Sequence, residues 1–479
     1  MSTQLKAQQG LTNLTPIKVI HILISLAIMV CFKFVPAAEP LTPLGVEVIG
    51  IFLGMLYGWL IANDSFWPSI FGLLFLGLSS YSTVPAVLRD GFGNSTVLLL
   101  FFFFAFTNII SAAGITEYIA RWIVSRKVVQ GRPYLLTLMI FLAMCALVIM
   151  VSCAAATMVI FPLIKEICRK WASTPLVGTI CVGCSFYMLL PFKSLPAVVF
   201  SSYTQMSGGD SIALVPYLAI VVVITAITMA LLLVLMKFVL RCDVSVIASS
   251  NKSMEELPKL SRYQKFIMVF FVTVIVLLLF PSFVPKTFIV STVLNNVGAT
   301  GILLGAVGVY IMVSLKEGMP AVQLFSKNIG WSIIFILAAA LSIADAMAAE
   351  STGISAWLVE LITPVVQGKS PLVLTAVMCV VGMALTNVAN NIATAAMLTP
   401  IAYSVGIACG ANPAALAVCV LLATNMGMAT PPASAPAAIV HGEKEWIPGS
   451  DAVKYGLVCC GITLVLILAV IFPMANVMF

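Results

Sequence analysis

The sequence predicts an all-α polytopic membrane protein with about 11 transmembrane helices, two re-entrant helical hairpins and two inverted repeats. Three observations support this fold class. Hydrophobic residues make up 62% of the 479 residues and charged residues only 9%, whereas a typical soluble protein is about a quarter charged. Many apolar runs are long enough to cross a bilayer, which takes ~20 residues of helix. Two of these runs contain a short polar break, and the breaks occupy matching places in the two halves of the chain.

The apolar runs give the elements in order. Residues 1–43 hold a polar N-terminal segment and a first span at 17–35, which lacks a cleavage site and is therefore retained. Repeat 1 is predicted at 44–240, with a re-entrant hairpin at about 95–115 and a broken helix at 152–154. The polar stretch 241–265 is the predicted linker. Repeat 2 is predicted at 266–479, with a second hairpin at about 331–352 and a broken helix at 390–392. The remaining spans are expected at 44–62, 66–80, 135–167, 177–203, 214–240, 266–283, 288–315, 372–408, 414–440 and 453–479.

The two halves share three landmarks in one order. Ser152 and Asn390 each begin a polar break ten residues before a proline, and they lie 238 residues apart. Gly114 and Gly353 are separated by 239 residues. The third landmark recurs after 240 residues, as Pro191, Ser194 and Pro196 and again as Pro431, Ser434 and Pro436. Nearly constant spacing indicates a structural duplication, and paired interrupted helices are the best sequence pointer to the binding site of a transporter.

Charged loops indicate that the repeats are inverted. The loop after the first predicted hairpin is basic, with Arg121, Arg126, Lys127 and Arg132, while its counterpart at 360–369 carries one acid and one base. Basic loops stay cytoplasmic, so the two hairpins are expected to open to opposite faces. The basic residues at 165–170 flank the same span from its far end and argue against this orientation.

The breaks have the composition of an ion or anion site. Unwound backbone at membrane depth is tolerated only when it is buried in protein or lines a wet cavity. Its free carbonyls can coordinate a cation, and Thr386 and Asn391 add side-chain oxygens. A helix that restarts after a break points its N-terminal amides, with their partial positive charge, at the cavity. Two such ends facing each other favour an anion with two acidic groups, although a kink that only packs would leave the same pattern.

The second-half motifs resemble the divalent-anion:sodium symporters, a family of dicarboxylate, citrate and sulfate transporters. That family carries Ser-Asn-Thr followed by Ala-Thr-Ala in each repeat and a Thr-Pro-Pro segment after it. The similar segments here are Asn390 to Ala396 and Ala429 to Pro432. The resemblance implies a homodimer in which a transport domain moves as an elevator against a scaffold. It also implies a Na⁺ site at Thr386, Ala389, Asn391 and Ala429, and a substrate site that includes Asn390, Asn391, Thr394, Thr430 and Pro431.

The first half departs from the family pattern. Ser152-Cys153-Ala154 stands where the family has Ser-Asn-Thr, which leaves Ser152 as a weak ligand for a first sodium ion. We expect Ser152, Cys153, Lys193 and Ser194 to complete the substrate site. Lys193 is a cation near membrane depth, where a charge is costly and by default functional. Its ammonium could take the place of a sodium ion, pair with a substrate carboxylate or sulfonate, or snorkel to an interface.

These features predict a secondary active transporter of small organic anions, di- or tricarboxylates above all, that works by alternating access as a sodium symporter or an exchanger. The alternatives are an anion channel on the same scaffold, or sodium-independent transport of sulfate or a sulfonate. The sequence contains no HExxH or GxSxG motif and no nucleotide-binding phosphate loop, so we expect neither an enzyme nor a nucleotide-driven pump. The net charge of +7 reflects basic loops and not nucleic-acid binding. The expected location is a cell membrane, such as a bacterial inner membrane, with lipid and a second copy of the chain as partners.

Overall fold

Every regular element in the described part of the chain is helical, as the sequence predicts. The structure is a computed structural model that describes residues 16–61, 66–124, 132–167, 173–239, 259–284, 287–316, 329, 331–354, 356–357, 360, 364, 368–388, 391–430, 433–442 and 447–479. Among them, eight helices are long and apolar enough to cross a membrane, or up to nine if one bent pair counts as a single span. The other apolar helices are shorter, at 10–17 residues. Most of the predicted linker lies outside the described residues.

The first half begins with helices that start at prolines. α3 (Pro43–Leu60) is capped by Thr42, whose hydroxyl accepts a hydrogen bond from Gly45 N at 3.1 Å. α5 (Val84–Phe92) and α6 (Ser95–Ala112) form a pair bent by 52°. The other elements of this half are α2 (Pro16–Cys31), η1 (Phe32–Phe34), α4 (Trp67–Leu78), α7 (Ile115–Val124), α8 (Pro133–Met150), α9 (Cys153–Ile167), α10 (Ser173–Tyr187), α11 (Ser194–Met206), α12 (Leu214–Val234) and η3 (Leu235–Val239).

The second half starts at α14 (Arg262–Phe283), where Ser261 and Gln264 form a capping box that satisfies two free amides. The elements that follow are α15 (Ile289–Lys316), α17 (Trp331–Ala348), η4 (Glu350–Thr352), α19 (Pro371–Val388), α20 (Asn391–Cys409), α21 (Pro413–Thr424), α22 (Ala435–Gly442), α23 (Gly449–Leu466), η5 (Ile467–Ile471) and α24 (Phe472–Met478).

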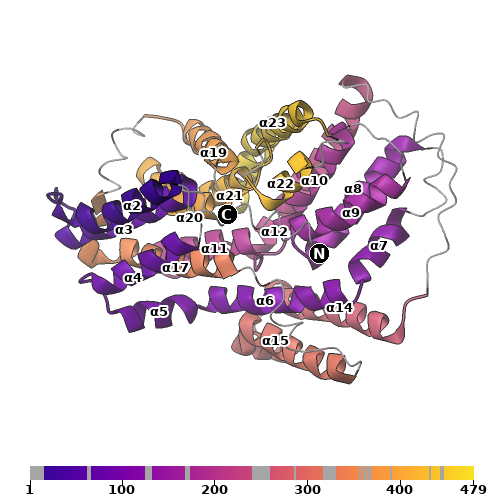
Figure 1. Cartoon of the computed structure of the whole chain (residues 1–479), viewed down its shortest axis with the longest axis horizontal. Coiled ribbons are helices and arrows are strands. Elements are labelled where there is room, and N and C mark those ends of the chain that lie inside the picture. Colours follow the sequence, from indigo (N-terminus) through magenta and orange to yellow (C-terminus); the bar gives the residue numbers. More distant parts are fainter. Residues whose placement is uncertain are drawn as a thin grey trace.

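Burial separates central helices from peripheral ones. The buried share of the span is 67% in α20, 61% in α17 and 56% in α8, but only 11% in α2 and 17% in α14. Val269, Val272 and Val276 of α14 are exposed, and such an apolar surface suits lipid. Figure 1 shows the same order, with α20 and α21 in the middle of the molecule and α14 and α15 along one edge. The interrupted helices therefore lie in the protein interior, where broken backbone can be satisfied.

The re-entrant hairpins differ in position from the prediction. The segments expected as hairpins, about 95–115 and 331–352, are instead single helices over most of their length, α6 and α17. An apolar run without an internal breaker continues as one helix, and residues 95–113 and 331–352 contain no Gly or Pro. The chain turns back at the polar breaks, which the sequence analysis interpreted as interruptions of single helices.

Packing across each break identifies the hairpins. In the second half, Gly382 of α19 lies beside Leu398 of α20, although the same separation along one continuous helix would be about 24 Å. α19 and α20 are therefore antiparallel. In the first half, Phe141 lies beside Gly178 and Met144 beside Gly183, so α8 and α10 run in the same direction. α9 carries the chain back between them, and α8 and α9 form the first hairpin (Figure 1).

The order of elements supports a duplication. The hairpin α8–α9 is followed by the interrupted helix α10–α11, and the hairpin α19–α20 by the interrupted helix α21–α22. The matching glycines Gly114 and Gly353 both adopt a left-handed backbone, with φ of 70° and 66°. The inverted orientation of the repeats and the scaffold and transport domains stay predictions.

Gly353→Ala is expected to lower the melting temperature more than Gly114→Ala. Both positions have positive φ, which costs an alanine about 1–2 kcal/mol. Only at Gly353 would a Cβ also meet backbone, at the carbonyl oxygen of Pro40, while at Gly114 the nearest atom is a side-chain nitrogen at 3.9 Å. Thermal unfolding in detergent, followed by intrinsic fluorescence, compares the two variants. Equal melting temperatures would contradict the packing argument.

Candidate functional site

A cavity of about 330 Å³ lies where the breaks of the two halves meet. The first repeat contributes polar groups of Ser152, Cys153 and Ser194, and the second contributes Asn391, Asn425 and Ser434. The volume falls at the lower end of the ~300–1,000 Å³ typical of small-molecule pockets. The structure thus brings together two segments that are more than half the chain apart.

Four helices begin at this cavity. Their first residues, Cys153 of α9, Ser194 of α11, Asn391 of α20 and Ala435 of α22, all belong to its lining. The first amides of a helix have no intrahelical acceptor and carry a partial positive charge. No charged side chain occurs among the described residues that line the cavity. Its electrostatic preference for an anion therefore comes from helix ends and polar side chains.

Serine side chains hold two of these helix starts. Ser152 Oγ accepts a hydrogen bond from Ala155 N at 3.2 Å, which caps α9. Ser434 Oγ accepts from Ala437 N at 3.2 Å and donates to Gly427 O at 2.7 Å. The two halves therefore present their helix starts in a similar way.

A buried network orders the second-half break. Thr386 Oγ1 lies 2.6 Å from Asn391 Oδ1 and 2.7 Å from Thr424 O. Asn391 Nδ2 donates to Asn425 O at 3.4 Å. Asn391 is thus tied to α19 and to the end of α21 while its side chain also reaches the cavity.

Asn387 holds the chain between α21 and α22. Its Nδ2 donates to Met383 O at 2.7 Å and Met426 O at 3.2 Å, and its Oδ1 accepts from Met428 N at 3.1 Å and Ala429 N at 2.7 Å. Thr430 Oγ1 donates to the carbonyl of Asn387. Asn387 was not among the predicted site residues, although an amide at the end of an apolar helix was a visible signal.

Three oxygen atoms converge beside Gly427. Asn391 Oδ1, Thr386 O and Ala433 O lie within 4 Å of the point that a Cβ on Gly427 would occupy. A Cβ at this position would lie only 2.5 Å from Asn391 Oδ1, so the close approach of these oxygens to the backbone depends on glycine. Carbonyl and amide oxygens are the ligands that hard cations prefer. The donor set fits a sodium ion, and two of its residues, Thr386 and Asn391, are ones that the family resemblance had indicated.

The first half has a lysine in this region. Lys193 is 1% exposed, so it does not snorkel to an interface, and that alternative is wrong. Its Nζ donates to the carbonyl of Val148 and, at 2.9 Å, to Val151 O. It lies 4.5 Å from the ring centroid of Tyr187 and is not part of the cavity lining. Tyr187, which lines the cavity, donates or accepts a hydrogen bond with Ser194 Oγ at 2.9 Å.

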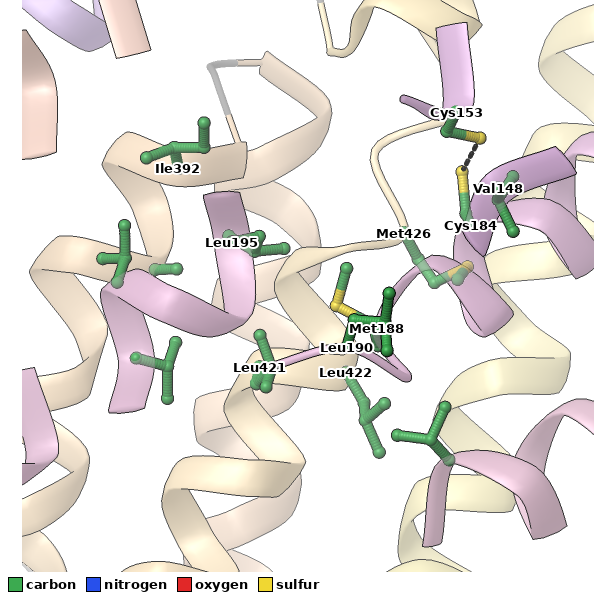
Figure 2. Packing of buried hydrophobic residues seen from close by; sticks show 14 of the residues in the cluster. Val148, Cys153, Cys184, Met188, Leu190, Leu195, Ile392, Leu421, Leu422 and Met426 are labelled. Atoms are coloured by element: carbon green, nitrogen blue, oxygen red, sulfur yellow. Dashed lines mark hydrogen bonds between the residues drawn. The ribbon is translucent and has the colours of Figure 1, made fainter. Parts of the chain in front are cut away.

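Apolar packing and one amide join the two breaks. Figure 2 shows Met188 and Leu190, from the break after α10, grouped with Leu421, Leu422 and Met426 at the end of α21. It also shows Cys153 Sγ facing Cys184 Sγ, at 3.6 Å. Asn425 Nδ2 donates to Cys184 O at 2.6 Å, a link between the repeats that the sequence analysis missed. Asn425 is a polar residue in an apolar run, which was its only signal.

Other predicted site residues have different surroundings. Thr394 is fully buried in α20, and Ala429 is buried against Asn387; neither belongs to the cavity lining, nor does Thr430. Ala389, Asn390 and Pro431 lie outside the described residues. In the described part of the chain, no group of three or more His, Cys, Asp or Glu could hold a metal ion.

Comparison with known proteins identifies the family. The sequence profile described as citrate transporter matches residues 57–421, most of the chain. The chain belongs to the citrate transporter family. This membership confirms the resemblance to the divalent-anion:sodium symporters. The protein is therefore a multi-pass membrane protein of a transporter family.

Two relatives agree with this assignment. The sodium-dependent dicarboxylate transporter SdcS of Staphylococcus saprophyticus is 22% identical over 254 residues, which cover 52% of this chain and 48% of that protein. The match thus spans about half the length of this curated relative. The crystal structure of the YdaH transporter of Alcanivorax borkumensis superposes with a TM-score of 0.57 at 12% identity. It covers 95% of this chain and 97% of its own, and it shows that the two transporters share a fold.

Asn387→Ala is expected to destabilise the transporter by about 1–3 kcal/mol, because it leaves the amides of Met428 and Ala429 without their acceptor. Thermal unfolding with and without a candidate anion measures the loss. Asn295→Ala is the matched control, since Asn295 is exposed and bonds only within its own helix, to Ser291. A melting temperature for Asn387→Ala equal to that of the control would show that Asn387 does not hold the break.

Proposed function

We propose that the protein transports small di- or tricarboxylate anions, coupled to sodium at the second-half site. The observation that carries the proposal is the meeting of four helix starts at one cavity that has no charged lining side chain among the described residues. Backbone amides at helix starts bind carboxylates well and supply charge from several directions. An anion with two or three acidic groups can use more than one of these ends at once.

The polar side chains give this anion its orientation. The same cavity is lined by Ser152 and Ser194 from the first repeat and by Asn391, Asn425 and Ser434 from the second. Hydroxyl and amide groups can donate to carboxylate oxygens. A substrate that contacts the breaks of both repeats can move together with them, as alternating access by an elevator motion requires.

Sodium has a role at the oxygen cluster beside Gly427. Thr386 O, Asn391 Oδ1 and Ala433 O would hold the ion next to the cavity, since Asn391 and Ala433 also line it. A cation there adds positive charge beside the bound anion and holds the second hairpin against the break between α21 and α22. The known sodium dependence of the relative SdcS supports this coupling.

We further propose that the protein works as a homodimer with an elevator motion. The family resemblance implies a scaffold domain that stays fixed in the membrane and a transport domain that carries the site as it moves. The apolar exposed faces of α14 and α15, with Val272, Ile289 and Met312, offer surface for lipid or for a second copy of the chain.

Asn391→Ala should reduce transport about ten- to a hundredfold, because it removes a side chain that lines the cavity and belongs to the oxygen cluster. Uptake of labelled succinate and citrate into proteoliposomes tests this, with and without an inward sodium gradient and with and without internal anion. The matched control is Asn476→Ala, because Asn476 is exposed and bonds only to Phe472 of its own helix. Undiminished uptake by Asn391→Ala would refute the proposed site.

Gly427→Ala should raise the sodium concentration for half-maximal uptake at least about tenfold. The added Cβ would lie 2.5 Å from Asn391 Oδ1 and would push this oxygen away from the other two. Gly461→Ala is the control, because Gly461 lies in α23 with nothing within 4 Å of a Cβ. A sodium dependence like that of the unmodified protein would place the ion elsewhere.

A further inference from the structure

The starting observation is a buried lysine without a carboxylate. Lys193 lies in the break between α10 and α11 and is among the largest fully buried side chains of the described chain. No carboxylate of the described residues pairs with it. Its Nζ binds the carbonyls of Val148 and Val151 and lies 4.5 Å from the ring centroid of Tyr187 and 5.7 Å from that of Phe103. Backbone carbonyls and aromatic faces are the partners that make a buried ammonium tolerable.

The two carbonyls belong to the tip of the first hairpin. Val148 lies in the last turn of α8, and Val151 is the residue that ends it. Carbonyls at the C-terminal end of a helix lack the amides of a following turn and carry a partial negative charge. These carbonyls can therefore bind a metal ion or an ammonium group. Here the cation comes from the neighbouring broken helix, so the lysine ties the hairpin tip to the α10–α11 break.

The repeat spacing shows what stands in the same place in the second half. The hairpin offset of 238 residues relates Val148 to Thr386 and Cys153 to Asn391. The offset of 240 for the interrupted helices relates Tyr187 to Gly427 and Lys193 to Ala433. The oxygen cluster is formed by Thr386, Asn391 and Ala433, and it lies beside Gly427. The small residue Ala433 therefore corresponds to Lys193. Gly427 corresponds to Tyr187, whose ring contacts the lysine.

We infer that Lys193 is a built-in cation that takes the place of a sodium ion at the tip of the first hairpin. This inference rests on the proposed function, and it deepens it by assigning ion coupling to the second half alone. An ammonium that belongs to the chain cannot dissociate, so the first half draws no energy from a sodium gradient. An empty site also keeps this positive charge, which disfavours movement without a bound anion and favours exchange.

The test compares two substitutions of Lys193. Lys193→Ala removes the cation and leaves its space and its carbonyls, whereas Lys193→Met removes the charge and fills the space. We expect Lys193→Ala to bind one more sodium ion per protomer than the unmodified protein, to be stabilised against heat by sodium but not by choline, and to show a steeper sodium dependence of uptake. We expect Lys193→Met to gain no sodium and to lose uptake about tenfold or more. Lys237→Met is the control, since Lys237 is exposed in η3, the turn that follows α12.

Radioactive sodium binding and thermal unfolding in sodium or choline chloride are the primary readouts, with proteoliposome uptake beside them. Equal sodium binding by Lys193→Ala and the unmodified protein would overturn the inference, and so would full uptake by Lys193→Met. If Lys193→Ala does not fold, the comparison uses Lys193→Arg, which keeps the charge. We then expect Lys193→Arg to keep the original sodium stoichiometry and uptake, while Lys193→Met loses uptake. Failure of the unmodified protein to transport succinate or citrate would contradict the proposed function, while the sodium-binding comparison would still decide the role of Lys193.

Discussion

The structure depends on one constraint: a helix that ends inside the membrane leaves backbone amides and carbonyls that lipid cannot bind. Four helices start at the central cavity of this protein, and the first amides of any helix have no acceptor within that helix. An unpaired buried polar group costs about 1–3 kcal/mol. Hydroxyl and amide side chains are therefore gathered at the breaks, where Ser152 caps α9 and Asn387 binds the amides of Met428 and Ala429.

The two repeats meet this constraint with the same backbone and different chemistry. In the first, a lysine side chain reaches the carbonyls at the hairpin tip, and an aromatic ring covers it. In the second, three oxygen atoms, one of them from Ala433, converge beside Gly427. A fixed cation and an exchangeable one can perform the same structural task, namely neutralising the ends of broken helices. They differ in energetics, because only an exchangeable ion can connect the movement of the protein to a gradient across the membrane.

The link between the halves constrains how the site can move. Asn425 of the second repeat donates to the carbonyl of Cys184 in the first, and the apolar side chains between the breaks pack as part of one core (Figure 2). A bound anion would contact residues from both repeats across this junction. The densely packed interior favours movement of the two breaks as one body, since separating them would expose a buried amide and apolar surface together.

Hydropathy and repeat spacing are properties of the chain itself, and they determined the membrane class, the helical fold, the duplication and the two polar breaks that meet at the cavity. The same reasoning did not locate the hairpins. A polar break in an apolar run has the same sequence pattern whether the chain continues in one direction or turns back. Asn387, Asn425 and Gly427 acquire their roles only from segments far along the chain that surround them. For Lys193, the sequence showed a cation near membrane depth and left three roles open. Tertiary structure decided that it faces the carbonyls of the first hairpin and not an interface, because the reach of a buried side chain depends on which backbone groups the fold places within a few ångströms of it.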